Sequence, residues 1–174
     1  MKKKRFISML ICIAMVVTMA PCIVSAADGV AINATNFPDA NFRNYVSSAN
    51  DTNSDGFLSA SEIAATKTIL VARKSISSLE GIEYFTAITR LYCHENNLTT
   101  LDVSNNTSLS WLSCGNNNLT TLDVSNNTSL TRLWCEGNNL TTLDVSNNTA
   151  LTILGCSNNN LTTLDVSNNT SLTR

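Results

Sequence analysis

Oxygen-bearing side chains recur at alternate positions at the start of residues 51–62, DTNSDGFLSASE, in the spacing of a calcium-binding loop. Calcium prefers carboxylate, amide and carbonyl oxygens, and such a loop needs a glycine at its sixth position for a sharp turn and a glutamate at its twelfth. Gly56 and Glu62 meet both requirements. The spacing therefore predicts a structural Ca²⁺ site with these ligands: Asp51, Asn53, Asp55, the backbone carbonyl of Phe57, Ser59 and Glu62.

Helical segments are expected on both sides of this EF-hand-like loop. Phe42 and Tyr45 recur at helical spacing before it, and Ser59 is an N-cap candidate for a helix after it. A plain Asp- and Asn-rich turn would explain the composition but not the full match to the pattern. Because the chain has one such loop, a cohesin-binding module or a calcium buffer, which need paired loops, is disfavoured. We expect the loop to brace a terminal cap, with a Kd on the order of 10⁻⁴–10⁻³ M.

Four cysteines could also carry chemistry, and they lie 21 residues apart at Cys93, Cys114, Cys135 and Cys156. Two disulfides are the usual expectation for four cysteines in an exported chain. The even spacing instead predicts equivalent core positions, and we expect reduced thiols. A nucleophile–base pair of Cys93 and His94 is disfavoured, because neighbouring strand residues point to opposite faces.

The segments between the cysteines are near-verbatim copies of LxCxxNNLTTLDVSNNTxLxx, so a repeated element positions these side chains. In a short strand Leu91 and Cys93 would face inward, and Leu98, Leu101 and Val103 would fill the rest of the coil. The recurring Asn96, Asn117, Asn138 and Asn159 are expected to bond turn backbone groups as buried amides. A degenerate first coil precedes these, with a 22-residue step that places Ile69 and Val71 like Leu91 and Cys93. The segment TTLDVSNNT is too short and polar for a full helix, so extended or 3₁₀ backbone is expected on the convex side.

Sequence variation between the copies is concentrated at the outward strand positions, which form three columns across the coils. Nearly all aromatic and basic residues of the repeats lie in these columns, as expected for a binding surface on a rigid sheet. Trp111 is expected between Arg90 and Arg132, within reach of cation–π contact. Free drift of exposed strand positions is the alternative. The candidate ligand-binding residues are Arg90, Tyr92, His94, Trp111, Arg132, Trp134 and Glu136.

This repeat resembles the bacterial leucine-rich repeats with a cysteine ladder found in internalin-like surface proteins, over residues 69–174. The resemblance implies stacked, free, buried thiols and a binding role. The predicted fold class is α+β, with a small helical EF-hand-like N-terminal cap over residues 27–68. A leucine-rich-repeat solenoid follows over residues 69–174, with a parallel β-sheet on its concave face.

Residues 1–26 are predicted to be a secretory signal peptide, with four basic residues, an apolar run and Val24 and Ala26 before the cleavage site. The run is short for a membrane anchor, and Pro21 before Cys22 disfavours lipidation. Removal of this segment leaves seven Lys and Arg against 13 Asp and Glu, a formal charge of −6. This charge disfavours nucleic acid and anionic membranes as partners.

We therefore predict a secreted or cell-surface module of a Gram-positive bacterium that binds a protein or glycan on its concave face and is not an enzyme. A passive spacer or targeting region of a larger surface protein is the alternative. The repeats stop at Arg174 before the next core leucine and without a C-terminal cap, which suggests a fragment.

Overall fold

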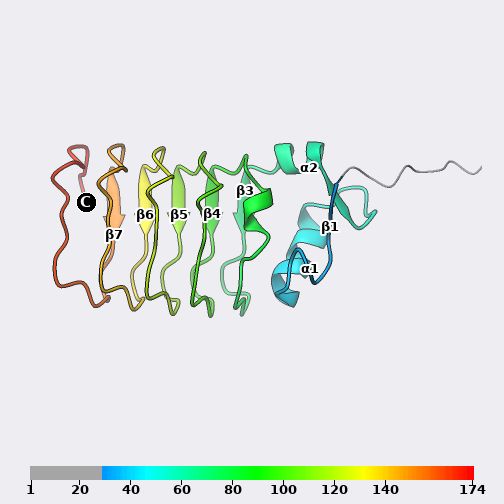
Figure 1. Cartoon of the computed structure of the whole chain (residues 1–174), viewed down its shortest axis with the longest axis horizontal. Helices are drawn as coiled ribbons and strands as arrows, with labels where there is room; N and C mark the ends of the chain where they lie inside the picture. The colour runs from blue at the N-terminus through cyan, green and yellow to red at the C-terminus, as the bar shows by residue number, and fades with distance from the viewer. Residues whose placement is uncertain (1–28) are drawn as a thin grey trace, which may run out of the picture.

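The computed structural model describes residues 29–174; the predicted signal peptide lies outside this range. The described chain has two parts in the order expected from the sequence (Figure 1). A small part with two helices lies at the N-terminal end, and a row of coils with parallel strands follows it. The predicted α+β fold class is thereby confirmed.

The coils share one five-stranded parallel sheet in which neighbours in sequence are neighbours in space. Leu91 pairs with Ile69 on one side and with Leu112 on the other, so the register follows the 22-residue step and then the 21-residue repeat. The predicted inward and outward positions therefore align in columns across the sheet. Its strands are β3 (Thr68–Leu70), β4 (Arg90–Tyr92), β5 (Trp111–Ser113), β6 (Arg132–Trp134) and β7 (Ile153–Gly155).

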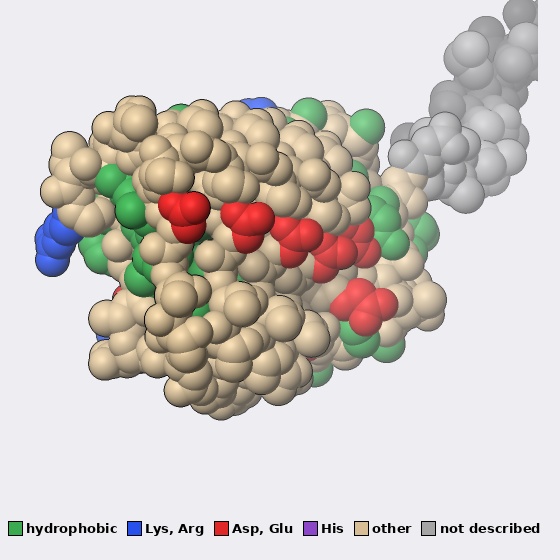
Figure 2. Space-filling model, turned by 60° about the vertical axis from the view of Figure 1, so that its left-hand side comes forward, with side chains coloured by type: hydrophobic (Ala, Val, Ile, Leu, Met, Phe, Trp, Pro, Cys, Tyr) green, Lys and Arg blue, Asp and Glu red, His purple; other side chains and the backbone are tan. Residues whose placement is uncertain are grey.

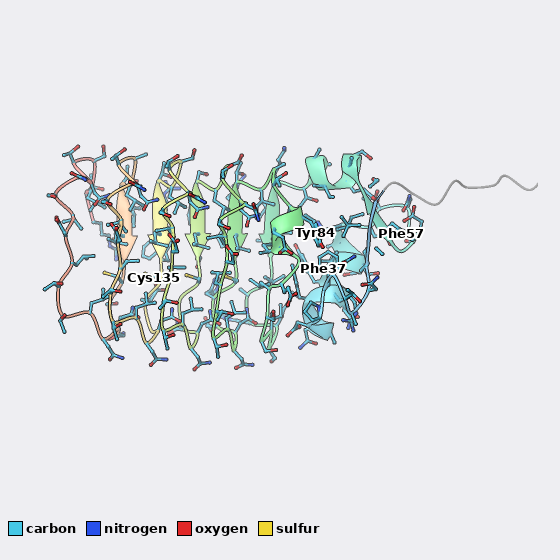
Figure 3. The ribbon with its side chains drawn as sticks, viewed as in Figure 1. Phe37, Phe57, Tyr84 and Cys135 are labelled. Carbon is cyan, nitrogen blue, oxygen red and sulfur yellow. The ribbon has the colours of Figure 1, made fainter. Side chains whose placement is uncertain are left out.

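The core is a continuous stack of the repeated apolar side chains. Leu91, Cys93, Leu98 and Val103 are fully buried, and Leu101 is nearly so. Their copies in the next two coils are equally buried, whereas Cys156 in the last coil is partly exposed. Each coil contributes too few apolar side chains to bury them alone, so the stack is the stabilising unit. Cys135 points into this interior in Figure 3.

Two ladders of buried asparagines run through the same stack. The predicted ladder is confirmed: Asn117 accepts a hydrogen bond from the Leu98 amide at 3.0 Å and donates to the carbonyl oxygens of Cys93 and Cys114 at 3.1 and 3.0 Å. A second ladder was not predicted. In it, the side-chain amide of Asn127 donates to the Val103 and Asn106 carbonyls at 3.0 Å each. The second ladder consists of Asn106, Asn127, Asn148 and Asn169, each at most 3 % exposed.

The convex side has turns in place of helices, as its composition predicted. The exception is the 3₁₀ helix η1 (Ile82–Tyr84) in the degenerate first coil. Figure 2 shows acidic side chains in a row on one face. Asp102 and its three copies each accept a hydrogen bond from the backbone amide of the serine two residues on, at 2.8–2.9 Å. Hydrogen bonds from the amide and the hydroxyl of that serine hold the pKa of each Asp carboxyl below its ordinary value, so the row stays ionised. The four Asp residues are exposed.

The N-terminal part places β1 (Gly29–Ala31) and β2 (Phe57–Ser59) antiparallel, with helices α1 (Ala40–Ala49) and α2 (Ala60–Ala65). Helix α1 begins after Asp39, whose side chain accepts hydrogen bonds from the amides of Asn41 and Phe42. Helix α2 begins with a capping box between Ser59 and Glu62. Strand β2 lies within the predicted calcium loop and pairs with β1, so a strand of this chain occupies the edge that a second loop would use in a paired arrangement.

Aromatic packing joins the helical part to the first coil. The rings of Phe37 and Tyr84, labelled in Figure 3, lie 5.7 Å apart, and Phe85 lies 6.4 Å from Phe37. Gly81, with φ of 102°, lets the chain pass so close to Phe37 that a methyl group there would overlap the ring. The helical part therefore covers the apolar end of the stack. Its boundaries at residues 27 and 68 stay predictions.

Candidate ligand-binding face and calcium loop

The parallel register brings the predicted ligand-binding residues side by side on the outward face of the sheet. Arg90, Trp111 and Arg132 are direct neighbours on β4, β5 and β6, and Tyr92 lies two residues further along β4. The outward columns continue past the strands, because the Gly137 amide donates to the Ser157 carbonyl at 2.9 Å.

Trp111 is the best-supported side chain on this face. The Arg132 guanidinium lies 4.5 Å from the centre of its ring, and the Tyr92 ring lies 5.6 Å away at an angle of 43°. The predicted cation–π contact thus forms with Arg132. The structure shows no such contact for Arg90 within the described residues. A tryptophan held between a cation and a second aromatic ring is pre-organised for binding, since it loses little freedom on contact.

Trp134 lies on the next coil over a glycine. A methyl group on Gly155 would lie 2.6 Å from Cε3 of Trp134, so the absence of a side chain at 155 allows the indole to lie flat on the backbone. The Arg174 guanidinium lies 6.0 Å from the Trp134 ring. Arg174 therefore belongs to the same face as Trp134, although it was not among the ligand-binding residues predicted from the sequence.

The third column includes a histidine and a glutamate. The His94 ring nitrogen Nδ1 lies 3.1 Å from the Ser113 hydroxyl, which links two columns. The Glu136 side chain is partly exposed, yet its Oε2 is buried with no hydrogen-bond partner among the described residues. It lies against Gly115, where a methyl group would come 2.8 Å from the Glu136 carboxyl carbon.

Two residues of this face were missed from the sequence. Leu70, which pairs with Tyr92, is 56 % exposed and extends the aromatic surface to β3. Its outward position follows from the inward placement of Ile69 and Val71, so the pattern contained the signal. Arg174 corresponds in the repeat to the outward position of Arg132, but its approach to Trp134 depends on the side-chain rotamer, which the repeat does not specify.

The predicted calcium ligands are only partly gathered. Asp51 accepts hydrogen bonds from the amides of Asp55 and Gly56 at 3.2 and 3.0 Å, and Asn53 accepts from Asp55 at 3.1 Å. Gly56 has φ of 82°, as the sixth position requires. The Phe57 amide donates to Asp55, so these hydrogen bonds close residues 51–57 into one compact loop.

Glu62 lies on the far side of the loop with both oxygens engaged. Its carboxylate accepts from the Thr52 hydroxyl and amide at 2.7 Å each and from the Ser59 hydroxyl and amide at 2.8 and 2.9 Å. The hydrogen bond from the Thr52 hydroxyl is the main cause that lowers the pKa of Glu62 from 4.5 to about 2. Within residues 29–174, no three His, Cys, Asp or Glu side chains are close enough together to hold a metal ion. All donors of the loop are oxygens, which fits calcium, but the Glu62 carboxylate accepts from Thr52 and Ser59, whereas Asp51 accepts from the Asp55 and Gly56 amides.

The cysteines form a ladder of unpaired thiols in the core. Burial raises the pKa of Cys93 and of Cys135 to about 12, and burial also raises the pKa of Cys114 well above its ordinary value. A thiol that stays protonated is neither a nucleophile nor a metal ligand. The described residues also include no helix long and apolar enough to cross a membrane.

A row of short parallel strands, with an inward Leu–Cys pair in each 21-residue coil and amide ladders at the turns, defines a leucine-rich-repeat solenoid with a cysteine ladder. Comparison with known proteins agrees. The chain is 45 % identical over 71 residues to internalin J of Listeria monocytogenes, which covers 41 % of this chain and 8 % of that protein.

Solved structures extend the likeness to most of the chain. The functional domain of InlJ from Listeria monocytogenes, which includes a cysteine ladder, superposes with a TM-score of 0.78 at 43 % identity, over 84 % of this chain and 32 % of that one. The internalin InlF of Listeria monocytogenes superposes with a TM-score of 0.67 at 23 % identity, over 83 % of this chain and 50 % of that one, and supports the fold alone. A family model described as the LVIVD repeat matches residues 93–114, 113–133, 135–158 and 154–174.

The repeat region is thus an internalin-like leucine-rich-repeat solenoid with a cysteine ladder. The chain spans about a third of the InlJ domain and less than a tenth of internalin J. What those longer proteins do as wholes therefore enters only as a proposal.

Proposed function

We propose that this chain is an exported ligand-binding module and that it binds a protein or glycan on the concave face of its solenoid. The observation that carries the proposal is the position of its two tryptophans: both lie on this face, on adjacent coils. Trp111 is held by Tyr92 and Arg132, and Trp134 rests on Gly155. Aromatic and arginine side chains fixed on a rigid sheet are the usual anchors of binding sites.

The contrast between the face and its scaffold supports the same proposal. Inward positions repeat unchanged in the four 21-residue coils, whereas the outward strand positions differ from coil to coil and carry nearly all the aromatic and basic residues of the repeats. Leu70 adds an exposed apolar side chain beside Tyr92. Binding is favoured over catalysis because the thiols are buried and protonated and the histidine is paired with Ser113. The location outside the cell rests on the predicted signal peptide and on the likeness to internalins.

The test is a ligand search with a tryptophan double variant. Wild type and Trp111→Ala/Trp134→Ala are compared on a glycan array and in capture of proteins from a host-cell surface preparation. The matched control is Thr121→Ala/Thr142→Ala, which changes exposed convex positions of neighbouring coils. We expect a ligand that binds wild type and control but not the tryptophan variant. If a ligand binds all three proteins equally, or nothing binds wild type, the chain acts as a spacer and the proposal is wrong.

We also propose that the loop of residues 51–62 binds Ca²⁺ and stabilises the helical cap. Asp51 is 6 % exposed, and the one ion pair found within residues 29–174 is that between Arg73 and Glu95, so Asp51 is a buried carboxylate without a cationic side chain. A bound cation would offset the cost of burying that charge. Asp51, Asn53, Asp55, the Phe57 carbonyl and Ser59 would hold the ion, and Glu62 would have to leave Thr52 to join them.

Thermal unfolding with and without calcium tests this site. We expect millimolar calcium to raise the Tm of wild type relative to chelator, and Asp51→Asn to abolish the rise while changing shape little. Asp144→Asn, on the convex row, is the control and should keep the full rise. An equal response to calcium in Asp51→Asn and wild type would show that the loop is not the site.

A further inference from the structure

We propose that Glu136 and Trp134 form a recess for a lysine or arginine side chain of a protein ligand. This inference rests on the proposed function, because it concerns the same concave face. It goes further in choosing a polypeptide over a glycan and in naming the side chain that would be recognised. It is carried by the charge, the burial and the glycine neighbours of Glu136.

Glu136 is the acidic residue of this face whose charge is not compensated. Glu95 at the edge of the sheet already pairs with Arg73, with 2.6 Å between its Oε1 and Nη2 of the arginine. Glu136 has no such pair, and its Oε2 is buried with no hydrogen-bond partner among residues 29–174. A carboxylate with one oxygen buried and unpaired lies in surroundings that stabilise its charge poorly, and a cation that reaches the exposed part of the Glu136 side chain would offset that cost.

Two glycines and an indole shape the space around this carboxylate. Methyl groups at Gly115 and Gly155 would lie 2.8 Å from the Glu136 carboxyl carbon and 3.5 Å from its Oε2, respectively. The same Gly155 position would place a methyl group 2.6 Å from Trp134, so the indole and the carboxylate lie over the same glycine. Trp134 and Gly155 are paired neighbours on β6 and β7, and Gly115 and Glu136 lie two residues beyond the ends of β5 and β6, which are adjacent strands (Figure 1). A carboxylate next to an aromatic face is the combination that binds ammonium and guanidinium groups.

The sign of the charge changes along the coil, and this selects the class of ligand. Arg132 lies four residues before Glu136, which is roughly 13 Å of extended backbone. Arg90 and Arg174 are at the same end of their coils as Arg132, and the Arg132 guanidinium is fixed over Trp111 at 4.5 Å. A complementary ligand carries a cation at Glu136 and an anion over the arginines. A neutral glycan has neither charge and an acidic glycan has only one, whereas a protein surface has both.

Small charged amino-acid derivatives test the recess without knowledge of the natural ligand. Nα-acetyl-lysine and Nα-acetyl-arginine N-methylamides are titrated into ¹⁵N-labelled protein, with the norleucine derivative as the uncharged match of lysine. The indole N–H signals of the two tryptophans report on the face directly. We expect saturable shifts of the Trp134 indole and of the amides around Glu136, at millimolar ligand, with the norleucine derivative about tenfold weaker.

Variants then separate the recess from general surface binding. Glu136→Gln keeps the shape of the side chain and should weaken binding of the lysine and arginine derivatives about tenfold. Gly115→Ala should also weaken their binding, because it displaces the carboxylate. Glu95→Gln is the control and should bind like wild type. Equal affinity of Glu136→Gln and wild type, or of the lysine and norleucine derivatives, would overturn the proposal. A natural ligand that needs Trp111 and Trp134 but not Glu136 would also overturn it while leaving the proposed function intact.

Discussion

Replacement of Asn117 by alanine should destabilise the solenoid far more than the same change at its neighbour Asn118. Asn117 is 7 % exposed and lies at the turn that leaves β5, whereas Asn118 is exposed and its side chain makes no hydrogen bond within the described residues. The two residues have the same side chain and adjacent backbone positions. The comparison therefore isolates the effect of the buried amide.

The expected magnitude follows from the groups that Asn117 satisfies. Its Oδ1 accepts from the Leu98 amide, and its Nδ2 donates to the carbonyls of Cys93 and Cys114. Alanine leaves the buried Leu98 amide without a partner. It also removes one of two amide donors from each carbonyl, because Asn96 still donates to Cys93 and Asn138 still donates to Cys114. The unpaired amide costs about 1–3 kcal/mol and each lost hydrogen bond about 0.5–1.5 kcal/mol, so we expect the free energy of unfolding to fall by at least about 2 kcal/mol. For a chain of this size that corresponds to a fall in Tm of roughly 4–8 °C. Asn118→Ala should stay within about 0.5 kcal/mol of wild type.

Urea unfolding followed by circular dichroism and tryptophan fluorescence measures both variants. Coincidence of the two signals would show that the stack unfolds as one unit, which is needed before free energies are compared. If Asn117→Ala and Asn118→Ala lose the same stability, the amide ladder does not hold the coils together. The role assigned to all of its members would then be wrong.

Three further results are expected. Hydrogen bonds, above all that from the Thr52 hydroxyl, lower the pKa of Glu62, so the stability that its carboxylate contributes is present above pH 4.5 and is lost as the pH falls towards 2. The Tm of Glu62→Gln, plotted against pH, should therefore converge with that of wild type over this range. Parallel curves would refute this. Thiol titration should find four free sulfhydryls in the denatured mature protein, and in the native protein only Cys156, the least buried of them, should react readily; fewer than four in the denatured protein would refute the reduced ladder. Gly81→Ala should lower the free energy of unfolding by about 2 kcal/mol or more, because it combines a positive φ with overlap on an aromatic ring. This loss should be larger than that of Gly56→Ala, where φ is also positive but the space is open. Equal losses would refute the close approach of Gly81 to Phe37.

Much of the solenoid could be predicted because each repeat position obeys one simple rule. Alternation in the strand places Leu91 and Cys93 inside, and the structure buries both completely. The same rule gives the order of the outward columns, which the strand register confirms. Recurrence of Asn96 at a turn predicted a buried amide, and it indeed accepts from the Ile76 amide and donates to the Cys93 carbonyl.

The missed features depend on side-chain direction, which a repeat does not specify. Asn106 recurs in the polar run of the convex side, where Asn reads as an exposed turn residue, yet it is fully buried and donates to the Ile82 and Phe85 carbonyls. Glu62 matches the last calcium ligand by spacing, but Thr52 competes for its carboxylate. The choice of Trp111 between Arg90 and Arg132 was likewise decided by rotamers rather than by register.

Near-verbatim repetition has a physical cause, and that cause indicates where function can change. An inward residue such as Cys114 lies between its copies on two neighbouring coils, so a change of size there disturbs both contacts. An amide such as Asn117 bonds backbone groups of its own coil and the preceding one, so its replacement removes hydrogen bonds in both. An outward residue such as Trp134 or Glu136 meets neither constraint, and the small residues beside them, Gly155 and Gly115, leave room for side chains that lean across coils. Differences between coils at these outward positions are therefore tolerated at little cost, and under the proposed function a change of ligand would require substitutions in those columns alone.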